Sequence, residues 1–128
     1  VLADDDVIQG RKFEDGVAKG CHHIDIHGRG RDQVRIPVAD GGSYDIPFRC
    51  LVAKGLDNVL VAGRCMSATR VAQGTARTMG PCLAMGAAAG TAAALQRTEN
   101  ADNPFRDFPV ARLRETLKSQ GSVVDGTH

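Results

Sequence analysis

Apolar residues in the first half of the chain follow a period of two over short stretches. Isoleucines alternate with polar residues at 24–26, and the alternation resumes at 34–38, as in half-buried β-strands. The sequence Asp-Gly-Gly-Ser at 40–43 predicts a hairpin turn that leads into an extended segment at 44–48. Residues 1–54 are therefore expected to form a β-rich region.

The second half of the chain has longer apolar patterns. Residues 58–63 contain the continuous apolar run Val-Leu-Val-Ala, which is typical of a strand covered on both faces. After a loop, Pro81 fits the first turn of a helix that continues to about Gln96, because this position tolerates the missing N–H group. An amphipathic pattern at 110–117 predicts a final helix that stops near Gly121.

These patterns predict an α+β fold. A chain of 128 residues has the size of one domain, so the β-rich residues 1–54 and the strand, loop and helices of residues 55–128 are expected to form one compact unit. Small side chains should dominate its core, because the chain has fifteen Gly, four Phe, one Tyr and no Trp. Because the chain begins at Val1 without an initiator methionine, we expect a fragment of a longer protein, with processing of the N-terminus as the alternative.

Charge and cysteine spacing exclude several classes of function. Sixteen basic and fifteen acidic residues give a net charge of +1, and this balance offers no electrostatic footprint for nucleic acid or an anionic membrane surface. The cysteines lack the C-x-x-C spacing of zinc ribbons, and their scatter does not indicate a disulfide framework. We therefore expect a cytoplasmic protein with four free thiols, which are Cys21, Cys50, Cys65 and Cys82.

Two glycines inside the long helical pattern, Gly86 and Gly90, indicate a close approach of another group. Each costs about 1 kcal/mol relative to alanine in an exposed helix, and their spacing of four places both on one face. That face could pack against a strand, another helix or the flat ring of a cofactor. Helix dimers in membranes use the same spacing, but the apolar stretch 79–95 is short and rich in weakly apolar Ala and Gly, so no membrane span is expected.

A longer pattern brings these elements together. The segment 55–70, Gly-Leu-Asp-Asn-Val-Leu-Val-Ala-Gly-Arg-Cys-Met-Ser-Ala-Thr-Arg, is followed by Gln-Gly-Thr-Ala-Arg-Thr-Met-Gly-Pro-Cys at 73–82 and by the helix of Ala and Gly. This order resembles the C-terminal end of the FAD-dependent oxidoreductase family, with relatives of the glutathione-reductase and succinate dehydrogenase/fumarate reductase type. Segments at 25–27 and 44–51 resemble the substrate-side region of the same family, and the whole resemblance covers about residues 7–121.

The resemblance implies an FAD-binding, Rossmann-like domain that is split along the sequence. In that fold an N-terminal Gly-x-Gly-x-x-Gly turn grips the dinucleotide, and the last strand and helix return to complete the same sheet. This chain would supply only the returning part, since its one similar stretch, Gly28-x-Gly30, has Gln33 in place of the third glycine. The missing N-terminal half is therefore an expected partner, and the open strand edge at 58–63 could drive self-association of the fragment.

The resemblance further implies the reaction class. The parent protein would be a flavoprotein oxidoreductase that transfers hydride or electrons through FAD and acts on a small-molecule substrate, and the isolated chain would be inactive. The alternative is a non-catalytic folded module, in which the helix of Ala and Gly serves only assembly or partner binding. A flavin absorption spectrum separates the two functions.

The resemblance also implies roles at the cofactor. Gly63 would let the backbone pass close to the ribityl or pyrophosphate part of FAD, where a side chain would obstruct. Arg64 stands where related flavoproteins commonly carry an acidic residue, and as a donor it could face a phosphate, pair with an acid of the missing half or hold the loop. Pro81 opens the helix, and the N–H groups of Cys82 and Leu83 are expected to be unpaired and to face the flavin C2 carbonyl.

Two arginines and a histidine are candidates for contact with the substrate. Arg77 resembles, by its place in the pattern, the arginine that faces the substrate carboxylate in the succinate dehydrogenase relatives, and Arg70 precedes it in the same loop. A guanidinium fork binds a carboxylate well, but either arginine could instead form an ion pair that fixes the loop. His27, oriented by a carboxylate, is a candidate for proton transfer. His23, Asp25 and His27 share one strand face, yet such triplets are more often hydrogen-bonded surface, so no metal is expected.

Overall fold

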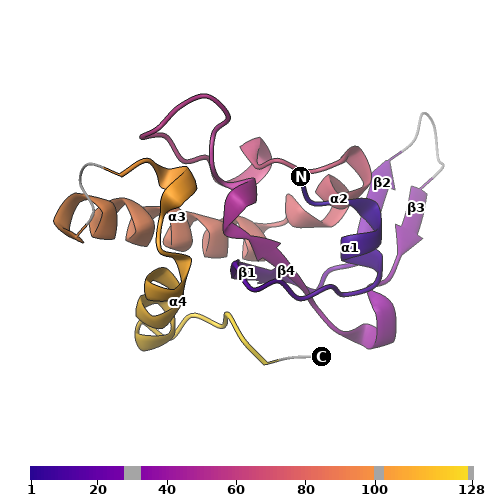
Figure 1. Cartoon of the computed structure of the whole chain (residues 1–128). Coiled ribbons are helices and arrows are strands. Elements are labelled where there is room, and N and C mark those ends of the chain that lie inside the picture. The colour runs from indigo at the N-terminus through magenta and orange to yellow at the C-terminus, as the bar shows by residue number, and fades with distance from the viewer. Residues whose placement is uncertain (28–32, 100–102, 127–128) are drawn as a thin grey trace.

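The structure is a computed structural model that describes residues 1–27, 33–99 and 103–126. One long helix, α3, crosses the molecule, with the strands and two short helices toward one end and α4 beneath the other (Figure 1). Short 3-10 turns connect several of these elements. The helices and strands are α1 (Asp4–Ile8), β1 (Gly16–Gly20), β2 (Ile24–His27), β3 (Gln33–Ile36), β4 (Tyr44–Pro47), α2 (Arg70–Ala76), α3 (Met79–Glu99) and α4 (Val110–Ser119).

Four short strands among the described residues form two separate antiparallel pairs. β1 pairs with β4, and β2 pairs with β3. The strands predicted in the first half are therefore present, but the hairpin turn predicted at 40–43 is wrong. Residues Ala39–Gly41 form a 3-10 turn in which Asp40 has a φ of 54°, and the chain passes there from one pair to the other. Gly28 and Gly30 lie outside the described residues.

The strand β1 has glycine at both ends, for a reason that lies in its partner strand. A Cβ atom added to Gly16 would lie 2.7 Å from Oδ2 of Asp45, and one added to Gly20 would lie 2.2 Å from the hydroxyl oxygen of Tyr44. The glycines therefore make room for side chains of β4, with which they pair. Lys19 strengthens the pairing through a 2.6 Å ion pair with Asp45, in which both side chains are almost buried.

The strand predicted at 58–63 is wrong. The segment forms only an isolated antiparallel bridge between Leu60 and Val52, supported by a 2.8 Å hydrogen bond from the Val61 N–H to the Leu51 carbonyl. Strands are stabilised by ladders to neighbouring strands, and within the described part of the chain no named strand lies beside this segment. One edge of it is therefore left without a partner strand there.

The helix α3 begins at Met79, two residues before the predicted start at Pro81. One side of α3 packs against β1 and α4. The other side is exposed and apolar, with Met79 84% and Leu83 75% exposed. Gly86 and Gly90 lie on this exposed side, where an added Cβ would meet nothing within 4 Å. The close approach that these glycines allow is therefore not made by the described residues.

The helix α4 confirms the predicted amphipathic helix. Leu113 and Leu117 are fully buried, and the chain turns away after the helix through Gly121 at a φ of 83°. One apolar core joins α4 to the strands and to α3. The mixture of helices and strands agrees with the α+β class, and the four cysteines are free thiols as predicted.

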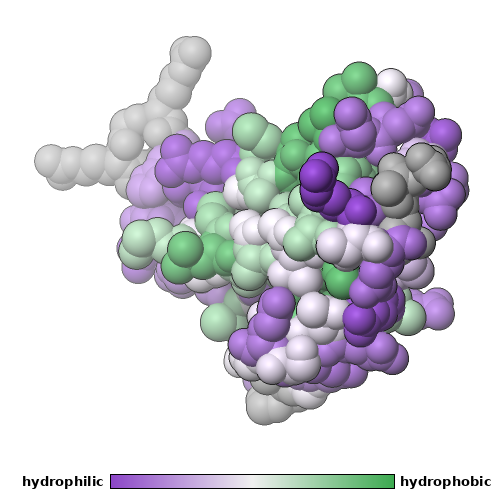
Figure 2. Space-filling view, turned by 90° about the vertical axis from the view of Figure 1, so that its left-hand side faces the viewer, coloured by the Kyte–Doolittle hydropathy of each residue, from purple (hydrophilic) through white to green (hydrophobic). Residues whose placement is uncertain are grey.

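The surface keeps further apolar residues exposed. Figure 2 shows green and white areas, which are apolar and neutral, across much of the face that it presents. Leu56 and Val59, on the loop before the 3-10 turn at Gly63–Cys65, are 53% and 37% exposed. Among the described residues no single helix is long and apolar enough to cross a membrane, although α2 and α3, which meet at 90°, pass that test as a pair.

Candidate functional site

The three residues expected at the substrate line one cleft between β2 and α2. The cleft has a volume of about 410 Å³. Arg77, which directly follows α2, lies three or four residues from Gln73 and Gly74, and these lie three or four residues from Arg70, so all share one face of the helix. The arrangement brings two guanidinium groups to the strand that carries the histidine. The lining residues are Asp25, Ile26, His27, Arg70, Gln73, Gly74 and Arg77.

A cap and a glycine seat α2 against β2. Oγ1 of Thr69 accepts a 3.2 Å hydrogen bond from the Ala72 N–H and so caps the helix. Further along, a Cβ added to Gly74 would lie 2.9 Å from Cγ2 of Ile24 and 3.2 Å from the Asp25 carbonyl oxygen. Only glycine allows the helix backbone to come this close to the strand. The neighbouring side chains of α2 are thereby held over β2.

Asp25 lies beside the histidine of the cleft. Its Oδ2 lies 3.3 Å from Nε2 of His27, and its Oδ1 accepts a 2.7 Å hydrogen bond from Nε2 of Gln33 on β3. The hydrogen bond from Gln33, helped by the positive charge of neighbours such as Arg35, holds the pKa of Asp25 below its usual value, although burial opposes this shift. The carboxylate is therefore ionised at neutral pH and lies beside the imidazole ring, whose side chain is 67% exposed.

The two arginines of the cleft differ in their contacts. Nη2 of Arg77 donates a 3.3 Å hydrogen bond to the backbone carbonyl of Asp25, so part of this guanidinium ties α2 to β2. Arg70 is exposed and has no polar partner among the residues that the structure describes. The lining contains two arginines and a single carboxylate, so the cleft carries a net positive charge. It can bind an anionic group through charge-assisted hydrogen bonds.

A larger groove is less suited to chemistry because its cations are already neutralised. It has a volume of about 850 Å³ and lies between α4 and the turn before β1. Arg49 pairs with Asp15, and both Arg114 and Lys118 pair with Asp125. Within the described ranges, no group of three or more His, Cys, Asp or Glu side chains is placed to hold a metal ion.

The backbone N–H groups at the start of α3 are paired differently from the prediction. The N–H of Cys82 donates a 3.1 Å hydrogen bond to the Thr78 carbonyl, so the expectation that this N–H is unpaired is wrong. Leu83 lies one residue further into the helix, where its N–H falls in the regular helical register. The two N–H groups without an intrahelical acceptor instead belong to Met79 and Gly80, and a Cβ added to Gly80 would meet nothing within 4 Å.

The 3-10 turn Gly63–Cys65 packs on the start of α3. Gly63 has a φ of 65°, and a Cβ added to it would lie 3.6 Å from Sγ of Cys82. Arg64 is exposed, and its carbonyl oxygen accepts a 3.4 Å hydrogen bond from Nε2 of Gln73. Pro81 is buried and has no N–H to donate. The turn and the helix start therefore form one corner with two open backbone donors.

Sequence patterns contain a signal for the start of α3. Threonine is a preferred residue before a helix, and Thr78 stands directly before Met79. Arg77 in turn precedes Thr78, so the positively charged cleft and the open helix start adjoin each other along the chain. This corner offers backbone donors to a carbonyl or anion on one side and guanidinium groups to an anion on the other.

Comparison with known proteins gives one match. The sequence matches the FAD dependent oxidoreductase family over residues 1–117. No curated protein and no solved structure matches the chain. The matched range contains the cleft, the start of α3 and most of α4. The chain therefore belongs to the FAD-dependent oxidoreductase family, and its cofactor is FAD.

Proposed function

We propose that this chain forms the flavin-ring end and the substrate cleft of an oxidoreductase that transfers hydride or electrons through FAD to or from a small anionic molecule. The observation that carries the proposal is the adjacency of the positively charged cleft at Arg77 and the open helix start at Met79. Hydride transfer needs the flavin ring and the substrate within contact distance. The corner between α2 and α3 offers a binding group for each.

On the flavin side, the N–H groups of Met79 and Gly80 take the place of the donors expected at Cys82 and Leu83. FAD itself supplies the redox chemistry, because its ring accepts and releases hydride. The positive end of α3, a helix of 21 residues, favours negative charge on a ring carbonyl. Gly63 leaves room for the ribityl chain beside this helix start.

On the substrate side, Arg70 and Arg77 hold a carboxylate or a similar anionic group. Arg70 has no polar partner among the described residues, whereas Arg77 shares one nitrogen with the Asp25 carbonyl. His27 holds or accepts a proton at the substrate, and the Asp25 carboxylate at 3.3 Å from its Nε2 keeps the ring in place. The substrate is therefore oriented by its negative charge, and the proton moves at the imidazole.

A further segment or chain supplies the phosphate-binding turn in this proposal, because the sequence contains no Gly-x-Gly-x-x-Gly turn. We assign to it the exposed side of α3 and the open edge beside Leu60. This side is apolar, and Gly86 and Gly90 permit a backbone to approach closely. Together, this chain and that segment would complete a Rossmann-like FAD domain. The free thiols accord with a cytoplasmic setting.

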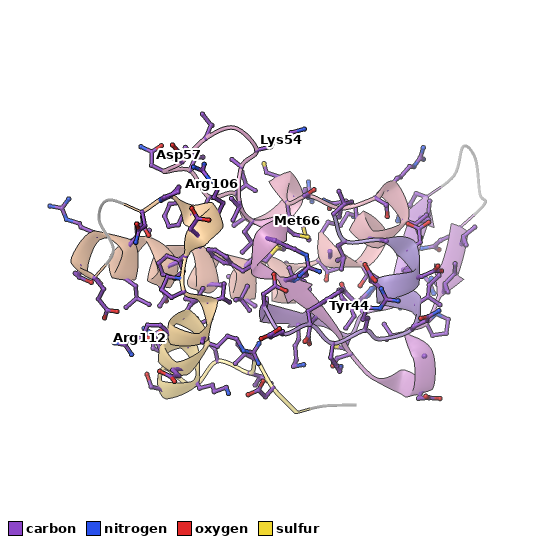
Figure 3. The ribbon with its side chains drawn as sticks, viewed as in Figure 1. Tyr44, Lys54, Asp57, Met66, Arg106 and Arg112 are labelled. Carbon is purple, nitrogen blue, oxygen red and sulfur yellow. The ribbon has the colours of Figure 1, made fainter. Side chains whose placement is uncertain are left out.

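Anion binding beside the flavin tests the proposal. The complete gene product is reconstituted with FAD, and its flavin absorbance is titrated with malonate. We expect Arg77→Gln to weaken malonate binding about tenfold or more, because a hydrogen bond between charged groups contributes about 1.5–3 kcal/mol. Arg106→Gln is the control, since Arg106 pairs with Asp57 on another part of the surface (Figure 3), and it should bind malonate like the wild type.

Two other outcomes would separate the parts of the proposal. A gene product that holds no flavin after reconstitution would favour the alternative of a non-catalytic module for assembly or partner binding. The substrate cleft would be overturned if the absorbance of the flavin-loaded protein did not change with malonate. The same holds if the malonate affinity were unchanged in Arg77→Gln. Either result would leave the proposed flavin contact standing.

A further inference from the structure

A chain of hydrogen bonds, buried at Tyr44 and Thr75, runs from β4 through α2 to the segment before β2. The hydroxyl of Tyr44 lies 3.0 Å from Oγ1 of Thr75, and this Oγ1 donates a 2.7 Å hydrogen bond to the His22 carbonyl. Tyr44 and Thr75 are both 0% exposed, and Tyr44 is labelled in Figure 3. Three segments far apart in sequence are thus joined by side chains that water does not reach.

The direction of these hydrogen bonds follows from the number of protons. Thr75 has one hydroxyl proton, which it donates to the His22 carbonyl. The Tyr44 hydroxyl must therefore donate to Oγ1 of Thr75. Burial raises the pKa of Tyr44 to about 12, so its hydroxyl keeps this proton at neutral pH. The chain has a single defined arrangement, with Tyr44 as donor at one end and a backbone carbonyl as acceptor at the other.

The same chain adjoins the anion cleft. Thr75 follows Gly74, where an added Cβ would lie 2.9 Å from Cγ2 of Ile24 and 3.2 Å from the Asp25 carbonyl oxygen. Two residues after Thr75, Arg77 donates a hydrogen bond to the same carbonyl. Successive residues at the end of α2 are therefore tied to the chain from residue 22 to residue 25. The separation between the guanidinium groups of α2 and the imidazole of β2 depends on these ties.

We propose that Tyr44 and Thr75 are positioning residues of the anion cleft, which hold α2 against β2 so that Arg77 and His27 face the same ligand. The inference rests on the proposed function only in taking this ligand to be an anion. Neither Tyr44 nor Thr75 lines the cleft, so they act through α2. Removing the Tyr44 hydroxyl frees α2 to shift and lowers the fraction of molecules with a formed cleft.

Tyr44→Phe is the test, with Leu117→Val as the matched control. Leu117 is fully buried on α4 and does not line the cleft, so its substitution lowers the stability of the core and leaves α2 in place. Malonate affinity of the FAD-loaded gene product should fall about two- to tenfold in Tyr44→Phe and stay unchanged in Leu117→Val. Equal affinities in the two variants would overturn the positioning role.

Hydrogen exchange gives a readout that does not need a ligand. Backbone amides of α2 should exchange faster in Tyr44→Phe than in Leu117→Val at equal global stability. If the wild type itself binds no malonate, the anion site of the proposed function fails, and this comparison alone decides the positioning role. Equal exchange of the α2 amides in both variants would then overturn it.

Discussion

Alanine in place of Gly20 should destabilise the protein by displacing the ring of Tyr44. The new Cβ would lie 2.2 Å from the Tyr44 hydroxyl oxygen, 2.3 Å from Cζ and 2.8 Å from Cε1, whereas nonbonded carbon atoms normally meet at about 3.5–4.0 Å. An exposed ring could turn aside. The Tyr44 ring is 0% exposed, and a close-packed interior has no volume to receive it.

The size of the effect follows from three contributions. Overpacking of a core costs about 1–3 kcal/mol. The displaced ring also loses its hydrogen bond to Thr75, and this loss lowers the free energy of unfolding by about 0.5–1.5 kcal/mol more. Alanine also restricts the unfolded chain, which raises the free energy of unfolding by about 0.4–1 kcal/mol and offsets part of this loss. We expect Gly20→Ala to lower the free energy of unfolding by roughly 2–3 kcal/mol.

Urea unfolding followed by tyrosine fluorescence measures this change at the site itself. Tyr44 is the only tyrosine of the chain, and there is no tryptophan. Gly90→Ala is the control, because its Cβ would meet nothing within 4 Å and alanine favours a helix. A free energy of unfolding for Gly20→Ala within about 0.5 kcal/mol of the wild type would refute the packing argument for β1.

Three further predictions concern pH, the exposed helix face and the cap of α2. Burial raises the pKa of Tyr44 to about 12 from 10.0; the unfolded chain therefore loses this proton first as pH rises, and roughly 2–3 kcal/mol of stability should be lost between these two pH values. Alkaline unfolding curves of Tyr44→Phe should lack that loss. Gly86→Ala should stabilise this chain by about 0.5–1 kcal/mol in thermal unfolding and reduce the flavin content of the complete gene product; unchanged flavin content would argue against a partner at this face. Thr69→Ala removes the acceptor of the Ala72 N–H and should cost about 1 kcal/mol in the same thermal assay; no change would mean that the cap is dispensable.

Elements whose formation depends on the residue pattern within the element itself could be predicted from the sequence. The helix α4 follows from the spacing of Leu113 and Leu117, which packs both on one side, and β2 follows from its alternation. The strand β1 could not be predicted, because glycine disfavours strands in isolation. Its glycines are required by the Tyr44 and Asp45 side chains of a strand much later in the chain.

The candidate site likewise combines residues that the sequence predicts with an arrangement that depends on distant contacts. His27, Arg70 and Arg77 can be named from the sequence, but their meeting in one cleft depends on Gly74, which brings α2 onto β2. The apolar run at 58–63 predicts a strand only if a neighbour is present to pair with it. The N–H groups of Cys82 and Leu83 were expected to be unpaired, whereas those without an intrahelical acceptor belong to Met79 and Gly80. Helix ends are poorly defined by sequence, and an error of a few residues changes which N–H groups are free.

The flavin reduction potential of Met79→Pro tests most directly whether the start of α3 faces the ring. Proline at the first helical position preserves the helix and removes one of its two open N–H donors. Met79→Ala keeps this N–H and is the control. In the FAD-loaded gene product, we predict a lower potential for Met79→Pro than for Met79→Ala, because negative charge on the reduced ring loses a donor. Equal potentials in the two variants would contradict the account.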